Sequence, residues 1–284
     1  MNKVVYTYKW TDGWLKGLDN PKAVTILRKS VEQANRWYET EMWCDTEKGF
    51  NIIKNLDIPF TRIQPLKELN QYQSSNWGIT KLITIKNQLH PHIHIDMDTI
   101  LLKELKFDTS KDIIWGNAET SLIYGKGHYS SFKHIYERYV KIAEKYEPNL
   151  LQEGVFDFSH APNNSLLIVN NPKLIKETII ELQERIKPYY KTKLGELNMF
   201  MEQFLFMNLC KRNGANGAYN HTNHDSKLDY MERKGEFHIS DYNKDLIMSG
   251  ELPFSDFEEN GWLHFEGLCD YSESEIKQIL DNIK

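Results

Sequence analysis

His90-Pro91-His92-Ile93-His94-Ile95-Asp96-Met97-Asp98 is the most informative stretch of this 284-residue sequence. It has the pattern of a β-strand that ends in two carboxylates separated by one residue. Side chains alternate between the two sides of a strand, so an extended chain would place His92, His94, Asp96 and Asp98 on one side. Ligands of open α/β sheets bind beyond the carboxyl ends of the strands. The stretch therefore predicts a site for a hard divalent cation that phosphate oxygens also bind.

Strand and helix signals alternate through the first half of the chain. We expect strands at Val4–Tyr8, Thr40–Cys44, Thr61–Ile63, Ile93–Asp96 and Ile113–Trp115, and helices after Asn20-Pro21 and at Asp45–Asn55 and Trp77–Gln88. In the first helix, Asn20 is the expected N-cap and Pro21 the first helical residue. Strands separated by helices of this length imply βαβ crossovers. The predicted fold class is α/β, with a Rossmann-like, mostly parallel sheet flanked by helices.

The second half of the sequence is less regular. It predicts helices at Phe132–Tyr146, Leu174–Ile186 and Met199–Lys211, a buried strand at Ser165–Val169, and a long loop or hairpin at Arg212–Lys234. The last helix opens with a capping box, Ser272-Glu273-Ser274-Glu275, and then places Ile276, Ile279, Leu280 and Ile283 toward the core. No internal repeat or interdomain linker stands out, so we expect one domain spanning residues 1–284.

Composition narrows the class of protein. Hydrophobic residues make up 40% and charged residues 26%, which is typical of a globular chain. A net charge of -5 argues against a nucleic-acid partner, because such proteins need a basic surface. The three cysteines are far apart, which argues against a disulfide framework and fits a reducing compartment. No stretch approaches the ~18 apolar residues of a membrane span, so we expect a cytoplasmic protein that could still associate peripherally with a membrane.

The histidines and the carboxylate pair each allow a second interpretation. Imidazoles at alternate strand positions can share a metal, so His90, His92 and His94 could form a zinc site. The strand that leads into the carboxylate pair already explains these residues, which favours a supporting or core role for His94. A lone Asp-x-Asp also occurs by chance, as two solvated carboxylates that cap a loop.

Two later segments add polar residues to this picture. Glu202 and Gln203 lie inside an otherwise apolar helix, where adjacent residues are about 100° apart, so at least one of them faces inward. A buried polar group needs a partner or a task. Near the C-terminus the chain reads Trp262-Leu263-His264-Phe265-Glu266-Gly267, which places a histidine and a glycine in one short segment.

Taken in order, these pieces resemble a glycosyltransferase of the GT-A fold. The similarity is to the retaining, metal-dependent family of bacterial lipopolysaccharide galactosyltransferases and glycogenin, and to related uncharacterised bacterial proteins. The matching pieces are Val4–Tyr8, Lys81, Asp96-Met97-Asp98, Asn163–Ile168, Glu202-Gln203 and His264–Gly267, and together they span most of the chain. Their order and spacing, and no single motif, carry the resemblance. It implies a nucleotide-sugar-binding half at 1–120 and an acceptor-binding, catalytic half at 121–284.

The resemblance also implies a role for each matching residue. Asp96, Asp98 and His264 would hold Mn²⁺ or Mg²⁺ on the diphosphate of a nucleotide sugar, with Asp96 also near the ribose. Gln203 would lie beneath the anomeric carbon, beside Glu202. The remaining donor contacts would come from Thr7, Tyr8 and Trp10 around the base, from Lys81 at the phosphates or sugar, from Asn163 or Asn164 at the sugar, and from Gly267 at the phosphates.

The sequence departs from the family pattern in three places. The phosphate-binding lysine after the late histidine is absent, because the chain continues as Leu268-Cys269-Asp270-Tyr271. Lys81, Lys227 or Lys234 would have to supply that cation. The family's Asn-Ala-Gly turn is Asn-Asn-Ser here, and its Asp-Gln pair is Glu-Gln.

The expected function is hexosyl transfer from a nucleotide sugar, a UDP-sugar being favoured, to a glycan or lipid-linked acceptor. A divalent ion would stabilise the leaving diphosphate, and a nearby carboxylate or amide oxygen the oxocarbenium-like sugar. Gln203 cannot act as a base, so its match to the family glutamine favours retention. If the Glu202 carboxylate points into the site instead, it could be a nucleophile or an inverting base. Two other functions stay open: a metal-dependent phosphohydrolase, and a catalytically inactive sugar-nucleotide-binding protein.

Overall fold

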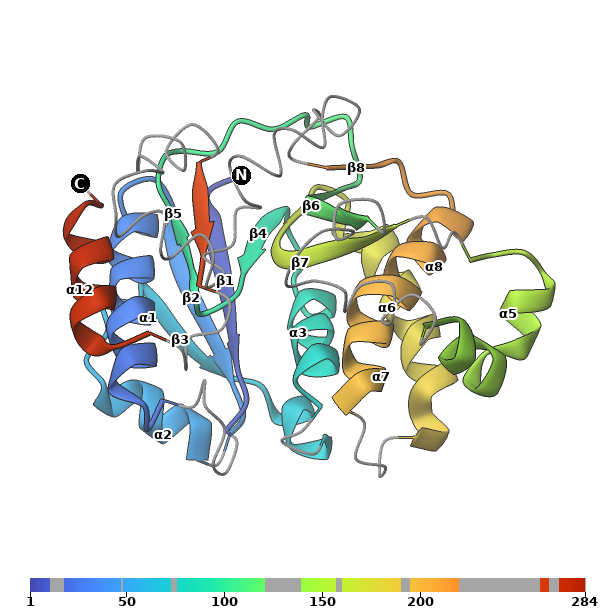
Figure 1. The fold of residues 1–284 in the computed structure, drawn as a ribbon, viewed down its shortest axis with the longest axis horizontal. Coiled ribbons are helices and arrows are strands. Elements are labelled where there is room, and N and C mark those ends of the chain that lie inside the picture. Colours follow the sequence, from blue (N-terminus) through green and yellow to red (C-terminus); the bar gives the residue numbers. More distant parts are fainter. Residues whose placement is uncertain are drawn as a thin grey trace. The chain divides into compact units, whose positions relative to one another are not determined.

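The structure is a computed structural model, and it describes nine segments of the chain: residues 1–10, 18–46, 48–72, 76–120, 139–156, 160–189, 195–219, 261–265 and 271–283. The chain divides into two compact units that are not contiguous in sequence (Figure 1). Unit 1 comprises Met1–Asn70, Ile93–Phe107 and Asp229–Lys284, and unit 2 comprises Gln71–His92 and Asp108–Leu228. The expectation of one domain stays a prediction.

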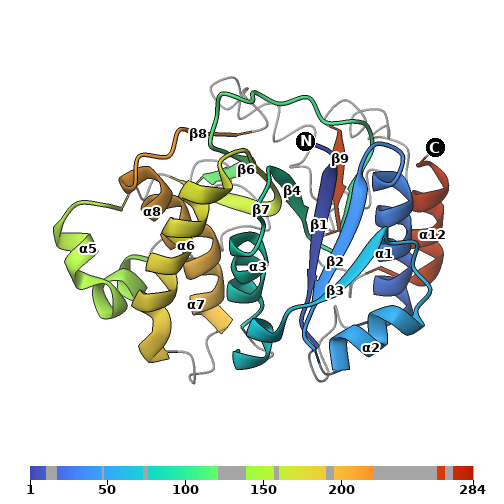
Figure 2. The ribbon, with the colours of Figure 1, turned by 180° about the vertical axis from the view of Figure 1, so that it is seen from behind.

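Four parallel strands form the sheet of unit 1, in the order β3, β2, β1, β4 (Figure 2). Their bounds are β1 (Lys3–Tyr8), β2 (Glu39–Cys44), β3 (Arg62–Pro65) and β4 (His92–Ile95). In β1, Val4, Val5, Tyr6 and Tyr8 are buried, and only Lys3 and Thr7 are partly exposed, as expected for a strand inside a sheet that is covered on both faces. This confirms the predicted α/β class with a mostly parallel sheet, because parallel neighbours require helical crossovers.

The helices of unit 1 are α1 (Pro21–Ala34), α2 (Lys48–Asn55) and α12 (Glu273–Asp281), with a short 3₁₀ helix η1 (Lys67–Gln71). The predicted start of α1 is confirmed, because the Asn20 side chain accepts from the Lys22 amide at 3.0 Å and Pro21 opens the helix. The predicted capping box of α12 is also present. Figure 1 shows α1 and α12 side by side, and the apolar residues predicted for α12 join Ala23 and Ile26 of α1 in one buried cluster.

A second, two-stranded sheet in unit 1 joins distant parts of the chain. Strand β5 (Thr99–Leu101) runs antiparallel to β9 (Trp262–His264), with Thr99 opposite His264. All six residues are buried. The sequence did not predict this pairing, which brings the segment after the carboxylate pair against the late histidine.

Unit 2 combines three strands with a set of helices. Its strands are β6 (Ile113–Thr120), β7 (His160–Val169) and β8 (Gly217–Tyr219). Strand β6 pairs antiparallel with β7, with a register irregularity between Trp115 and Asn117, and parallel with β8. The helices are α3 (Trp77–Lys86), α5 (Pro148–Gln152), α6 (Pro172–Ile186), η2 (Lys187–Tyr189), α7 (Gly195–Met199), η3 (Phe200–Leu205) and α8 (Phe206–Arg212).

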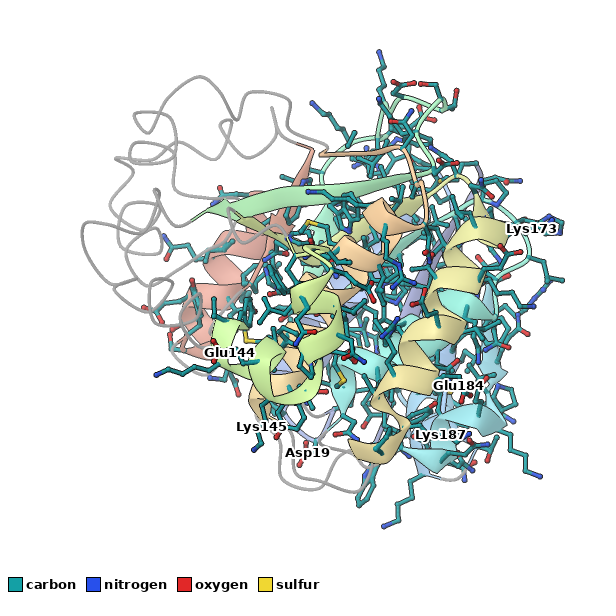
Figure 3. The ribbon with its side chains drawn as sticks, turned by 90° about the vertical axis from the view of Figure 1, so that its right-hand side faces the viewer. Asp19, Glu144, Lys145, Lys173, Glu184 and Lys187 are labelled. Atoms are coloured by element: carbon teal, nitrogen blue, oxygen red, sulfur yellow. The ribbon has the colours of Figure 1, made fainter. Side chains whose placement is uncertain are left out.

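Helix α6 shows why the predicted amphipathic segments fold as expected. Its N-cap Asn171 accepts from the Leu174 amide at 3.2 Å. Ile175, Ile179 and Leu182 are buried, while charged residues such as Lys173 and Glu184 lie on the outer side of the helix (Figure 3). The apolar stripe thus decides which face packs inward.

The helix predicted at Met199–Lys211 is present but interrupted. It runs through α7, η3 and α8, and η3 is a π-helix, in which the backbone turn is wider than in an α-helix. All six residues of η3 are buried, including Glu202 and Gln203. The sequence indicated a regular helix here, because helical periodicity does not report a local change of turn width.

Some predicted elements lie outside the described residues. Of the helix predicted at Phe132–Tyr146, the structure describes residues 139–146, which are helical. Of the loop or hairpin predicted at Arg212–Lys234, residues 212–219 are described and include β8. Among the helices in the described part of the chain, none combines the length and apolar character that crossing a membrane requires.

Candidate functional site

The carboxylate pair lies in a tight turn after β4, because the strand ends before it. Strand β4 ends at Ile95, and the Thr99 amide then donates to the Asp96 carbonyl oxygen at 3.0 Å, which closes a tight turn over Asp96–Thr99. The prediction that one extended strand aligns His92, His94, Asp96 and Asp98 is therefore wrong beyond Asp96. The turn brings the two carboxylates near each other by a different route.

Asp96, Asp98 and His264 form a compact group of metal-ligating side chains in unit 1. One ligand atom from each lies within 4.8 Å of the others, and His264 Nε2 is 3.4 Å from Asp98 Oδ1. The pairing of β5 with β9 holds the group together, because it sets Thr99 opposite His264 and lets the Phe265 amide donate to the Asp98 carbonyl oxygen at 2.9 Å. Asp98 and His264 are buried, and Asp96 is half-buried.

The chemistry of this donor set fits a divalent cation. Two carboxylate oxygens suit Mn²⁺ or Mg²⁺, and an imidazole nitrogen beside them favours a transition metal such as Mn²⁺. Two carboxylates that lie this close together also repel each other, which a shared cation relieves. Among the described residues, this is the one group of three such side chains, and the alternative zinc group of His90, His92 and His94 does not form.

His92 and His94 of β4 lie near polar groups outside the Asp96, Asp98 and His264 group. His94 Nε2 lies 2.9 Å from Thr7 Oγ1 on the neighbouring strand β1, and His92 Nδ1 lies 3.0 Å from the carbonyl oxygen of His90. Both imidazoles are buried. This agrees with the supporting role expected for His94, and it engages Thr7, which the resemblance had assigned to the base.

Asp45 anchors the segment that follows β1, and the sequence did not single it out. Its Oδ2 accepts from the Trp10 amide at 2.8 Å, and its Oδ1 from the Gly49 amide at 3.2 Å. The Lys48 ammonium lies 3.9 Å from the centre of the Trp10 ring. Burial raises the pKa of Tyr8 to about 12, so this phenol keeps its proton near neutral pH. An aspartate directly after a strand and before a helix is a capping signal that would have indicated Asp45.

A second polar group lies in unit 2, around the π-helix η3. The Lys81 ammonium of α3 is 2.7 Å from Glu202 Oε1 and donates to the Asn164 carbonyl oxygen at 3.0 Å. The Asn164 side-chain amide donates to the Glu202 carbonyl oxygen at 2.5 Å. Lys81, Glu202 and Asn164 are 5%, 1% and 1% exposed, so the ion pair is shielded from water.

Gln203 follows Glu202 in the same π-turn and has its own partner. Its Oε1 accepts from the Tyr139 hydroxyl at 3.3 Å, and the residue is 7% exposed. The Tyr139 ring lies against Phe200 and Phe204, with centroids 5.8 and 5.2 Å away. Asn163 instead accepts from the backbone amide of Ser165 at 2.9 Å.

The residues predicted from the sequence thus fall into two sets. Asp96, Asp98 and His264 meet in unit 1, and Lys81, Asn164 and Glu202 meet in unit 2. Gly267 lies outside the described residues, as do Lys227 and Lys234. The direct links of Lys81 and Asn164 to Glu202, across 121 and 38 positions of the chain, were not foreseen.

These features define an α/β protein with a buried carboxylate–imidazole group at the end of a parallel strand. The chain belongs to the family described as "Family of unknown function (DUF6734)", whose sequence model matches residues 10–250. No curated protein matches the chain.

Several solved structures are similar to the chain at low identity. The PaToxG glycosyltransferase is 14% identical, with a TM-score of 0.41, and the similarity covers 100% of this chain and 85% of that one. The glycosyltransferase GlyE of Streptococcus pneumoniae TIGR4 is 13% identical, with a TM-score of 0.43, and this chain spans 63% of it while 99% of this chain is covered. Mouse xyloside xylosyltransferase 1 in its apo form is 10% identical, with a TM-score of 0.44, covering 94% of this chain and 98% of that one.

Proposed function

We propose that this protein is a metal-dependent glycosyltransferase that moves a hexose from a nucleotide sugar, a UDP-sugar being favoured, to a glycan or other acceptor. The observation that carries the proposal is the convergence of Asp96, Asp98 and His264 after a parallel strand. In open α/β sheets, ligands bind beyond the carboxyl ends of the strands, where such a group is well placed for a diphosphate.

In this proposal, the unit 1 group binds the donor through a cation. Asp96 and Asp98 supply carboxylate oxygens, and His264 supplies a neutral imidazole nitrogen. A bound Mn²⁺ or Mg²⁺ would neutralise the negative charge that develops on the leaving diphosphate. Tyr8 is the last residue of the neighbouring strand β1 and Trp10 follows it, which supports a role for both at the base, with the Trp10 backbone held by Asp45.

The unit 2 group supplies the polar side chains proposed to act on the sugar. The Gln203 amide oxygen would stabilise positive charge on the anomeric carbon, and an amide cannot remove a proton from the acceptor. This supports transfer with retention, in which the leaving phosphate takes the acceptor's proton. The Glu202 carboxylate is paired with the Lys81 ammonium. This pairing favours a structural role for Glu202 over that of a nucleophile or an inverting base.

The two asparagines contribute differently in this proposal. Both are held by the chain itself: Asn163 by the Ser165 amide and Asn164 by its links to Lys81 and Glu202. A contact of Asn164 with the donor sugar would require its amide to leave the Glu202 carbonyl oxygen. We therefore propose Asn163 as the better candidate for the sugar, and Gly267 keeps its proposed role of close approach to the phosphates.

A donor screen tests the proposed function. Purified protein is incubated with UDP- and GDP-hexoses, with and without Mn²⁺, and released nucleoside diphosphate is measured. We expect release that depends on Mn²⁺ and disappears in Asp98→Asn, while Asp281→Asn, an exposed aspartate of α12, behaves as wild type. Release of inorganic phosphate instead would favour a phosphohydrolase. Binding of UDP-sugar without turnover would favour an inactive binding protein.

A further inference from the structure

Lys81 makes contacts that its expected role as a phosphate ligand does not require. Lys81 is 5% exposed, and its ammonium is 2.7 Å from Glu202 Oε1, 3.0 Å from the Asn164 carbonyl oxygen and 5.9 Å from the centre of the Trp77 ring. A buried ammonium is stable only when it is paired and hydrogen-bonded. These contacts provide that, and all of them come from unit 2.

The same three residues close a ring of contacts between three elements. Lys81 on α3 binds both Glu202 on η3 and Asn164 on β7, and Asn164 in turn donates to the Glu202 carbonyl oxygen at 2.5 Å. Glu202 is therefore held by its side chain and by its backbone at once. A side-chain donor at a backbone carbonyl is one of the ways in which a helix is locally widened, and Glu202 lies within the π-helix η3.

Close packing fixes the same residue from a third direction. Gly78 lies three positions before Lys81, on the same face of α3, and a β-carbon there would lie 2.9 Å from Glu202 Cβ. Gln203 follows directly in the turn and is held by the Tyr139 hydroxyl at 3.3 Å. The position of Gln203 thus depends on the π-turn, in which Lys81 fixes the preceding residue, Glu202.

We propose that Lys81 is a positioning residue: it fixes Glu202, and through that residue Gln203, and it does not bind the donor phosphates. The role rests on the proposed function, because it concerns the side chains that would act on the sugar. Without the ammonium, the Glu202 carboxylate is left buried without its cation, and the π-turn that presents Gln203 loses a restraint. Lys81 therefore affects turnover and leaves nucleotide binding intact.

A double-mutant cycle tests this role. The variants are Lys81→Met, Glu202→Gln and the double variant, with Lys86→Met as a matched control, since Lys86 lies on the same helix and donates to the neutral Gln183 side chain at 2.8 Å. Turnover of the donor found by the screen gives kcat, and titration with UDP and Mn²⁺ gives the nucleotide affinity. The cycle separates an effect through Glu202 from an independent one.

The positioning role predicts three results. Lys81→Met lowers kcat by at least about tenfold and changes the affinity for UDP with Mn²⁺ by less than about twofold. The double variant has the kcat of Glu202→Gln, because Lys81 acts only through that carboxylate. Lys86→Met behaves as wild type. If Lys81→Met does not fold, comparing Glu202→Gln with the double variant decides, since a neutral buried pair is tolerated better than a lone charge.

Two results would overturn the role, and they differ from failure of the function itself. Loss of UDP affinity in Lys81→Met would make Lys81 a phosphate ligand. A double variant whose loss of kcat is the product of the two single losses would show that Lys81 acts independently of Glu202. A wild-type protein that turns over no donor would instead refute the proposed function, and the role of Lys81 with it.

Discussion

Gly78 is the second residue of α3, and a β-carbon added there would lie 2.9 Å from Glu202 Cβ and 3.0 Å from the Asn198 carbonyl oxygen. Neither neighbour is the far end of a flexible side chain: one is the first carbon of a buried side chain and the other is backbone. The substitution Gly78→Ala therefore forces α3 and the segment Asn198–Glu202 apart.

Two opposing effects set the size of the change. Alanine in place of glycine stabilises a helix interior by at most about 1 kcal/mol, and less near the first turn. Overpacking of a tight contact costs about 1 to 3 kcal/mol. The balance is a loss of about 1 to 2 kcal/mol in the free energy of unfolding, which is about a five- to thirtyfold change in the folded-to-unfolded ratio.

Urea denaturation of both proteins, followed by far-ultraviolet circular dichroism, measures this difference. Glu32→Ala, at an exposed position of α1, is the control, and its stability should lie within about 0.5 kcal/mol of wild type. The sign of the Gly78→Ala effect decides the matter. A variant more stable than wild type would mean that α3 does not approach Glu202 as closely as described.

Three further predictions concern thiols, pH and stereochemistry. Burial raises the pKa of the Cys44 thiol to about 12 and also raises that of Cys210. In a Cys269→Ser protein, which keeps only these two cysteines, the native state should resist Ellman's reagent and the unfolded state should react at two thiols. Fast labelling of the native protein would contradict this burial. Burial raises the pKa of Glu147 above its ordinary 4.5, so its contribution to stability is full below that value and declines as the pH rises through the folded-state pKa. Glu147→Gln should remove this decline from urea curves taken between about pH 4 and about pH 7, and an unchanged decline would assign it to other groups. Gln203→Ala should lower kcat with little change in donor affinity, and NMR of the product from an α-linked donor should show an α-linkage; a β-linkage would exclude retention.

Local signals in the sequence were sufficient for the elements that depend on local chemistry. Asn20-Pro21 and the Ser272–Glu275 capping box predicted the starts of α1 and α12, because a cap involves only residues within one turn. The run of β-favouring residues at Val4–Tyr8 and the strand-like run before Asp96 likewise predicted β1 and β4. The α/β class follows from these elements and their spacing.

Features that depend on distant residues or on local turns were harder to predict. Periodicity alone extended the strand through Asp98, whereas the chain turns after Ile95. The pairing of Thr99 with His264 is a long-range contact, and only the resemblance pointed to that histidine. The ion pair of Lys81 with Glu202 also joins distant residues. The sequence therefore indicated that at least one of Glu202 and Gln203 faces inward, without showing a partner for either.

The most direct test of the central claim is calorimetric titration of UDP into the protein with and without Mn²⁺. If Asp96, Asp98 and His264 hold the cation, UDP binds tightly only with Mn²⁺, Asp98→Ala loses this metal-dependent binding, and His264→Ala loses less of it, because water can take the place of the imidazole. Full Mn²⁺-dependent UDP affinity in both Asp98→Ala and His264→Ala would contradict the account.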